Sequence, residues 1–185
     1  IAKEKAGIIK PGVPLVFVNK EKTVSEVLSA VAKRCDCRTY PVDKTKIENV
    51  NINHKSIDFS YKSSYYNNVI CTLHTCGMYQ VENAAVALCG FEVLFSKEEI
   101  DVSKLQSVLA ETCWAGRMEE IREDVFVDGA HNEDGIDAFL ESVEAVSGDR
   151  KCWLLFSVVS DKNYRDMIHR VEASGLFDGY IVAGI

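Results

Sequence analysis

The sequence predicts an α/β protein built from two strand–helix units. In the first half of the chain, an apolar run at Leu15–Val18 is followed by an amphipathic segment and by a second strand-like run at residues 39–42. From Val125 onward, apolar runs and amphipathic segments alternate again as strand, helix, strand, helix and strand. Such alternation is typical of α/β folds with parallel strands.

The boundary between the two units is predicted after Gly116, which divides the chain into residues 1–116 and residues 117–185. A chain of 185 residues is long enough for one good core or two small ones. It begins with Ile1 rather than methionine and stops within an apolar run at residues 181–185. We therefore expect it to be a piece of a longer protein.

The composition is ordinary for a soluble globular protein, with 47% apolar and 26% charged residues. A net charge of -7 argues against a nucleic-acid partner. The sequence contains no apolar run long enough to span a membrane and nothing that resembles a secretory signal. We therefore expect a cytoplasmic protein without a membrane partner.

Seven cysteines are scattered through strand-like and helix-like segments, which disfavours a disulfide scaffold. Cys35 and Cys37, together with Cys71 and Cys76, would be the candidate zinc ligands, but their spacing fits no familiar four-ligand site. We predict that most of the seven are reduced and buried as small hydrophobes.

The first half is expected to contain two strand regions and a capped helix. Leu15–Val18 is continuously apolar, which predicts a buried parallel strand. Thr23, followed three residues later by Glu26, predicts a capping box that opens a helix. Residues 57–61 alternate in polarity and predict one strand of an antiparallel hairpin, with residues 69–73 as its partner.

The clearest helical pattern runs from Met78 to Phe95. Asp101 precedes a second helical pattern and is predicted to be its N-cap. The apolar face of the first helix is expected to consist of Val81, Ala84, Ala85, Leu88 and Phe95.

Beyond the predicted boundary, Trp153 is expected in the core of a strongly apolar strand. The elements expected there, in order, are a buried strand at Asp124–Val127, a helix at 133–146, a strand at 152–159, a helix at 164–171 and a strand at 180–185.

A polar cluster follows the strand predicted at Asp124–Val127, at the point where open α/β sheets place ligand-binding residues. Asp128 can accept a hydrogen bond from a sugar hydroxyl, and His131 can donate one to a phosphate oxygen. Arg117, which follows a glycine, can grip phosphate with its planar guanidinium. Taken singly, the three also fit ordinary roles as a linker arginine, a helix-capping aspartate and a surface histidine.

Three motifs together resemble the folylpolyglutamate synthases of the Mur ligase superfamily. They are IAKEKAGIIKPGVP at residues 1–14, GMYQVENAAVA at 77–87, and WAGRME at 114–119 followed by DGAHN at 128–132. They occur in the family's order and together span most of the chain. The resemblance implies the C-terminal part of a Mur-ligase-type central ATPase domain, followed by a truncated Rossmann-like C-terminal domain.

The resemblance also implies roles for five residues. Lys5 matches a lysine that is carbamylated in the family and then binds magnesium, since a carbamate offers the carboxylate-like oxygens that suit Mg²⁺. Asn83 matches an adenine contact. Arg117 matches a phosphate contact, Asp128 a ribose contact, and His131 a residue near the phosphates. On their own, Lys5 fits a solvated surface charge and Asn83 a helix residue chosen for close packing.

The activity implied by the resemblance is that of an ATP-dependent amide ligase. In the family, ATP phosphorylates a folate carboxylate, the amine of L-glutamate attacks the acyl phosphate, and ADP and phosphate leave. Positioning and charge neutralisation supply most of such catalysis. The expected partners are ATP, Mg²⁺, L-glutamate and either folate or dihydropteroate, and the family implies a monomer.

Two alternatives remain beside this interpretation. One is another Mur-type amide ligase, of the peptidoglycan-precursor or cyanophycin type, although Tyr79 with Gln80 and the DGAHN motif favour the folate branch. The other is a non-catalytic nucleotide-binding module, since the sequence contains no glycine-rich phosphate loop. The 185 residues alone are therefore expected to be inactive. Asp161 and Lys162 fit a solvated turn, with a glutamate contact left open.

Overall fold

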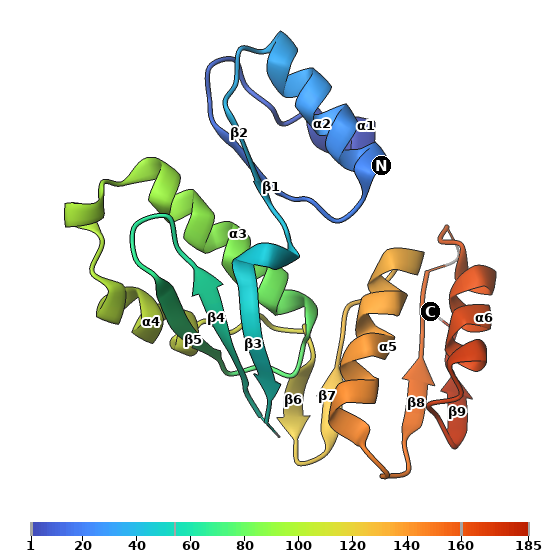
Figure 1. The fold of residues 1–185 in the computed structure, drawn as a ribbon. Coiled ribbons are helices and arrows are strands. Elements are labelled where there is room, and N and C mark those ends of the chain that lie inside the picture. Colours follow the sequence, from blue (N-terminus) through green and yellow to red (C-terminus); the bar gives the residue numbers. More distant parts are fainter. Residues whose placement is uncertain (1, 54, 160, 185) are drawn as a thin grey trace. The chain divides into compact units, whose positions relative to one another are not determined.

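The structure is a computed structural model that describes residues 2–53, 55–159 and 161–184 (Figure 1). Contacts within the chain divide it into two compact units, each assembled from separated segments. Unit 1 comprises the chain up to Val50, Asp58–Thr72 and Val81–Ala110, and unit 2 comprises Asn51–Ile57, Leu73–Gln80 and the chain from Glu111 onward. The contiguous division after Gly116 stays a prediction, because these units are defined by contacts rather than by sequence order.

The first strand–helix–strand prediction is confirmed. Two strands pair in parallel through a connecting helix, and a short N-terminal helix lies alongside that helix (Figure 1). The parallel pairing follows from the crossover, because a helix returns the chain to the edge where the first strand began. The elements are α1 (Ala2–Ala6), β1 (Leu15–Val18), α2 (Lys22–Arg34) and β2 (Thr39–Val42).

The predicted capping box at Thr23 is wrong. Helix α2 begins at Lys22, and the residue before it, Glu21, is extended and makes no side-chain cap hydrogen bond. Thr23 therefore lies inside the first helical turn, where its side chain is not at the N-cap position. The threonine–glutamate spacing places the N-cap at Thr23, whereas the observed N-cap is Glu21, two residues earlier.

A three-stranded sheet in the order β3–β4–β5 follows, with a 3-10 turn before it. The connections between consecutive strands are too short for a parallel crossover, so the strands are antiparallel and the predicted hairpin is confirmed. Strand β3 was not predicted, because its centre is exposed and carries little apolar signal. The elements are η1 (Lys44–Lys46), β3 (Ile47–Ile52), β4 (Ile57–Lys62) and β5 (Asn68–Leu73).

Three helical elements come next: α3 (Tyr79–Leu94), η2 (Lys97–Glu99) and α4 (Val102–Glu111). The helix predicted at Met78 to Phe95 is confirmed to within one residue at each end. Its buried face consists of Val81, Ala84, Ala85, Leu88 and Cys89.

Phe95 was wrongly placed on that face. It follows the helix end, is 42% exposed, and its ring lies 5.7 Å from the ring of Phe91. The predicted cap of α4 is confirmed, because the Asp101 carboxylate accepts a hydrogen bond of 3.1 Å from the backbone N–H of Lys104.

The strand predicted at Asp124–Val127 exists in part but is not buried. Strands β6 (Glu119–Arg122) and β7 (Val125–Val127) form a two-stranded antiparallel hairpin. Val125 is 45% exposed and Val127 40% exposed. The apolar run pairs with its nearest upstream neighbour through a tight turn at Asp124, which has a φ of 58°. The predicted burial of this strand is therefore wrong, although a strand is present at the start of the predicted alternation.

The remaining alternation is confirmed. Two parallel strands are joined by a helix, and α5 and α6 lie side by side (Figure 1). The core between these two helices contains Ile136, Met167 and Val171. These residues pack against Leu154 and Phe156 of the strand at Trp153–Phe156. The elements are α5 (Glu133–Ser147), β8 (Trp153–Phe156), α6 (Tyr164–Ser174) and β9 (Gly179–Val182). Both strands are shorter than predicted, and Ile185 of the predicted last strand lies outside the described residues.

Trp153 is not in the core, contrary to the sequence prediction. It is 69% exposed, as is Leu155 two residues later at 67%. Successive side chains of a strand point to opposite faces, so Leu154 and Phe156 meet the helices while Trp153 and Leu155 face away. The Trp153 ring lies over Gly179 of the paired strand, where a Cβ atom would come within 2.5 Å of the ring.

The cysteine prediction is correct for some positions only. Cys71, Cys76 and Cys89 are buried, whereas Cys113 is exposed and the other three are partly exposed. Burial raises the pKa of the Cys71 thiol to about 11, so it stays protonated and inert. Within the described ranges no cysteine forms a disulfide. The helices of these same ranges include none with the length and apolar character that crossing a membrane requires.

Candidate functional site

The loop after β7, at residues 128–132, is the centre of the candidate site. The backbone N–H of Gly129 donates a hydrogen bond of 2.7 Å to the carbonyl of Gly116. The N–H of Arg117 donates in turn to the carbonyl of Trp114 at 3.2 Å. The first bond holds the segment before β6 against the loop after β7, as expected when a hairpin brings its two ends together, and the second closes a turn within that segment.

Arg117 is thereby placed against Gly129. A Cβ atom at residue 129 would stand 3.1 Å from Nη1 of Arg117 and 3.9 Å from its Cζ. Glycine therefore lets the guanidinium approach the loop backbone more closely than a side chain comfortably allows. Arg117 is partly buried, so its guanidinium lies against the loop and stays accessible to an anion.

Asp128 is the most highly connected residue of the loop. Its Oδ2 accepts hydrogen bonds from the Tyr79 hydroxyl at 2.6 Å and from the Met118 N–H at 2.9 Å. Its Oδ1 accepts from the Ala130 N–H at 2.8 Å. Both oxygens are therefore oriented by fixed donors, which suits a carboxylate that must present one lone pair in a defined direction.

The Tyr79 hydroxyl remains a donor over the physiological pH range. Burial raises the pKa of Tyr79 above its usual value, and the hydrogen bond to Asp128 raises it further. A protonated phenol beside an ionised carboxylate can only donate to it. Sequence reasoning used Tyr79 as a marker of the folate branch and missed this contact, which joins residues 49 positions apart.

His131 is exposed, and its Nδ1 lies 2.8 Å from the carbonyl oxygen of Gly129. Because a carbonyl oxygen only accepts, this contact places a proton on Nδ1. Neutral His131 then presents Nε2 as an acceptor, and donation to a phosphate through Nε2 requires the imidazolium form. The donor role predicted for His131 therefore depends on its protonation.

Asn132 is the N-cap of α5, as the sequence suggested. Its Oδ1 accepts a hydrogen bond of 2.8 Å from the backbone N–H of Gly135. This bond satisfies one of the free N–H groups at the helix start and sets the direction in which the chain enters α5. Asn132 therefore shapes the loop that carries Asp128 and His131.

A buried serine fixes the segment that carries Tyr79. Ser142 of α5 is fully buried; its Oγ accepts from the Met78 N–H at 3.0 Å and donates to the Ala138 carbonyl at 2.8 Å. The start of α3 is thus tied to α5 within unit 2. Nothing in the local sequence around Ser142 distinguishes it from an ordinary helix serine, so this contact was not predictable.

The other two predicted residues belong to unit 1. Asn83 is exposed on α3, one turn beyond Tyr79, and Lys5 is exposed on α1. The structure therefore brings Arg117, Asp128 and His131 together in unit 2.

The described residues do not form a magnesium site by themselves. Among them, no group of three or more histidine, cysteine, aspartate or glutamate side chains is placed to hold a metal ion. The free ammonium of Lys5 cannot ligate a cation, and a carbamate at Lys5 would supply a single carboxylate-like ligand. Magnesium binding through Lys5 stays a prediction.

The turn after β8 is exposed. Lys162 Nζ lies 3.5 Å from Asp161, whose side chain is 71% exposed. The side-chain amide of Asn163 donates to Glu133, the first residue of α5, at 2.8 Å. These contacts fit the interpretation of a solvated turn.

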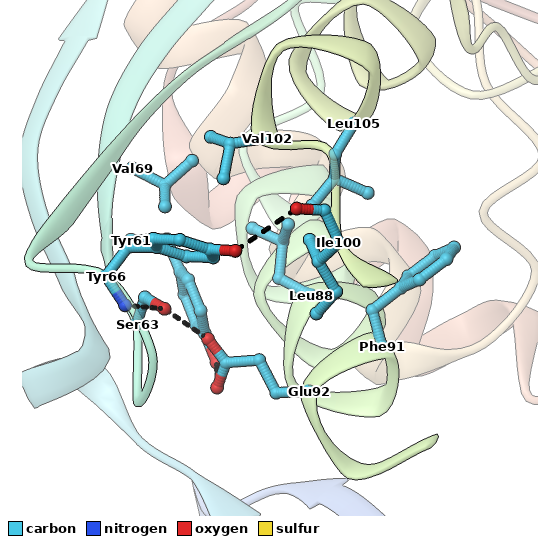
Figure 2. Close-up of a pocket in the computed structure, with 10 residues that line it drawn as sticks. All are labelled: Tyr61, Ser63, Tyr66, Val69, Leu88, Phe91, Glu92, Ile100, Val102 and Leu105. Atoms are coloured by element: carbon cyan, nitrogen blue, oxygen red, sulfur yellow. Dashed lines mark hydrogen bonds between the residues drawn. The ribbon is translucent and has the colours of Figure 1, made fainter. Parts of the chain in front are cut away.

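Unit 1 contains a separate small, open hollow between the β4–β5 hairpin, α3 and α4. Figure 2 shows Glu92 at its polar side, where the carboxylate accepts from the Ser63 hydroxyl at 2.6 Å. Glu92 also accepts from the Ser64 N–H at 3.0 Å. These bonds tie the hairpin loop to α3, and the rest of the lining is mostly apolar. None of the five predicted site residues lines this hollow, so we assign it to packing.

Comparison with known proteins finds one matching domain family and several similar enzymes. Residues 116–184 match the family described as Mur ligase, glutamate ligase domain. The chain is 31% identical to the dihydrofolate synthase/folylpolyglutamate synthase of Bacillus subtilis, in an alignment that covers 93% of this chain and 41% of that protein. It is 26% identical to the folylpolyglutamate synthase of Lacticaseibacillus casei, with 94% and 42% covered.

Solved structures agree with this similarity and confirm the predicted Mur-ligase-type α/β fold. A structure described as an FPGS-AMPPCP-folate complex has a TM-score of 0.87 at 23% identity and covers 100% of this chain and 45% of that one. Mycobacterium tuberculosis folylpolyglutamate synthase complexed with ADP has a TM-score of 0.85 at 25% identity, with 98% and 41% covered. The chain spans about two fifths of the length of the curated relatives it matches. The chain is thus similar in sequence and fold to folylpolyglutamate and dihydrofolate synthases, and its residues 116–184 match the Mur ligase glutamate ligase domain.

Proposed function

We propose that the protein encoded by the complete gene is an ATP-dependent ligase that adds L-glutamate to a folate through an acyl phosphate. The observation that carries this proposal is the gathering of Arg117, Asp128 and His131 at one loop of a Mur-type glutamate ligase domain. The relatives named above are dihydrofolate and folylpolyglutamate synthases, and the solved relatives include complexes with AMPPCP, ADP and folate.

The reaction has two steps, and the residues of this chain act mainly on the nucleotide. A folate carboxylate oxygen attacks the γ-phosphorus of ATP, and ADP leaves. The glutamate amine then attacks the acyl carbon, phosphate leaves with the electrons of the broken C–O bond, and the amine loses a proton. Negative charge develops on the transferring phosphoryl group, so the guanidinium of Arg117 would stabilise the transition state.

The nucleotide is held by three further residues in this proposal. Asn83 contacts the adenine, because an amide can donate and accept at the purine edge. Asp128 accepts from a ribose hydroxyl, and His131 lies near the phosphates. Lys5, as a carbamate, supplies one ligand to Mg²⁺, with its other ligands outside the described residues. We further propose a cytoplasmic monomer whose domain boundary falls after Gly116.

Two rival functions are less well supported. A peptidoglycan-precursor or cyanophycin ligase shares the domain family, but the Bacillus subtilis and Lacticaseibacillus casei relatives are folate enzymes. A non-catalytic nucleotide-binding module is less well supported because the relatives named above are dihydrofolate and folylpolyglutamate synthases. The 185 residues alone contain no phosphate loop and are expected to be inactive.

The test is ATP-dependent incorporation of labelled glutamate by the protein expressed from the complete gene. Dihydropteroate and tetrahydrofolate are offered separately, which decides whether the protein has one or both acceptor activities. Arg117→Ala is expected to abolish incorporation, whereas the exposed Arg122→Ala serves as the matched control and retains it. Absence of incorporation onto both acceptors by the wild-type protein overturns the folate proposal.

A further inference from the structure

We infer that Tyr79 is a positioning residue for Asp128 and restricts that carboxylate to recognition of a single ribose hydroxyl. The inference rests on the proposed function, in which Asp128 is the ribose contact. It concerns a residue to which the family resemblance gives no role, and it predicts that the enzyme recognises one of the two ribose hydroxyl groups of the nucleotide.

The count of acceptor positions on Asp128 carries the inference. An ionised carboxylate has about four lone-pair positions, two on each oxygen. Oδ2 already accepts from the Tyr79 hydroxyl and the Met118 N–H, at 2.6 and 2.9 Å. Oδ1 accepts from the Ala130 N–H at 2.8 Å. One position therefore remains, on Oδ1, while ribose offers two neighbouring hydroxyl groups.

Tyr79 is itself rigidly held, so it can orient the carboxylate. A Cβ atom at Gly77 would stand 3.1 Å from Cζ of the Tyr79 ring, so the ring lies directly over this glycine. The adjacent Met78 N–H is anchored by its bond to the buried Ser142 hydroxyl. The phenol thus projects from a fixed segment, and its hydrogen bond fixes the rotation of the Asp128 carboxylate.

Loss of the phenol would leave Oδ2 with one donor. The carboxylate would then rotate more freely, and Oδ2 would gain an acceptor position for a second hydroxyl or for water. A phenylalanine at position 79 would keep the ring over Gly77 but remove the donor. The expected consequence is weaker discrimination between ribose and deoxyribose, rather than a general loss of nucleotide binding.

The experiment measures dissociation constants of ADP, 2′-deoxy-ADP and 3′-deoxy-ADP for the protein expressed from the complete gene. The variants are Tyr79→Phe and Asp128→Asn. Tyr65→Phe is the matched control. The Tyr65 hydroxyl also makes a short hydrogen bond, of 2.8 Å to the Glu92 carbonyl, and both of these residues belong to unit 1. Thermal melting checks that each variant is folded.

In the wild-type protein, one deoxynucleotide should bind roughly 10- to 100-fold more weakly than ADP, the range for one hydrogen bond to a charged group. The other deoxynucleotide should bind within about twofold of ADP, since a hydroxyl without a partner in the site contributes little. In Tyr79→Phe, the dissociation constants of ADP and of the weaker-binding deoxynucleotide should differ by about threefold or less. In Tyr65→Phe, their ratio should equal the wild-type ratio.

Three outcomes would overturn the inference, and they are distinguishable. If the wild-type protein binds both deoxynucleotides more weakly than ADP by the same factor, recognition of a single hydroxyl is contradicted without any variant. Loss of discrimination in Asp128→Asn but not in Tyr79→Phe rejects the role of Tyr79 while the proposed function stands. Failure of the wild-type protein to bind ADP removes the proposed function, and the inference with it.

Discussion

The guanidinium of Arg117 lies against the backbone of Gly129, so that a Cβ atom at residue 129 would stand 3.1 Å from Nη1. This distance is tighter than most Cβ contacts, and the neighbour is the end of a flexible side chain. A side chain at residue 129 would therefore displace the guanidinium rather than the backbone. The catalytic arginine of the proposed ligase thus depends on a glycine twelve residues later in the chain.

Gly129→Ala is expected to reduce kcat by up to about 100-fold, the scale associated with ångström-size misplacement of a catalytic group. The melting temperature should change little, because residue 129 lies outside the left-handed region and an alanine adds no backbone strain. Steady-state kinetics and thermal melting provide the measurements. An unaltered kcat would show that the position of Arg117 next to Gly129 does not matter for the reaction.

Ser142→Ala is expected to lower the free energy of unfolding by roughly 1–3 kcal/mol, because it leaves the Met78 N–H without its buried partner. Urea denaturation followed by circular dichroism measures this change. Ser29→Ala, an exposed serine in α2, is the control and should stay within about 0.5 kcal/mol of the wild-type value. Equal stability of the two variants would contradict an anchoring role for Ser142.

Gly90→Ala is expected to raise the free energy of unfolding by roughly 0.5–1 kcal/mol. Gly90 lies inside α3, and an added Cβ would meet no described atom within 4 Å. Gly12→Ala is the paired variant, and it should destabilise by roughly 1–2 kcal/mol because Gly12 has a φ of +72°, in the left-handed region. Thermal or urea unfolding measures both, and changes of the same sign would show that the two backbone conformations are misassigned.

Asp101→Ala is expected to destabilise the protein at neutral pH and to have less effect in acid. The hydrogen bond from the Ser103 hydroxyl, followed by that from the Lys104 N–H, lowers the pKa of Asp101 below 3.8. A carboxyl group with a lowered pKa in the folded state contributes stability above its unfolded pKa, and this contribution fades as the pH falls through the folded pKa.

The difference in unfolding free energy between wild type and Asp101→Ala should therefore be constant near neutral pH and narrow as the pH falls below 3.8. Urea denaturation at a series of pH values gives this difference. Asp149→Ala, in the exposed turn after α5, controls for the general effect of removing a carboxylate. A difference that stays constant into acid would contradict the capping contribution of the ionised Asp101.

Local features of the fold were predictable because their signals are local. The α3 helix is marked by its apolar residues at helical spacing, and the caps at Asp101 and Asn132 are marked by residue types that bond to a backbone N–H three positions later. The error at Thr23 shows the limit, since the same signal occurs where the helix begins earlier.

Exposure was not predictable from local signals. Trp153 and Val125 lie in apolar runs that are typical of buried strands, yet each has a face that the described elements do not cover. Whether an apolar residue is buried depends on which element packs against its strand, and this information is carried by residues elsewhere in the chain.

The sequence by itself determined the α/β class, most helices and strands, and the residue types that point to nucleotide chemistry at Arg117, Asp128 and His131. Only the tertiary structure decided that β7 pairs backward with β6, that Arg117 rests on Gly129, and that Tyr79 holds Asp128. The physical reason is distance along the chain. Helical periodicity and capping act over three or four residues, whereas a hydrogen bond between residues 79 and 128 exists only once the intervening chain has folded.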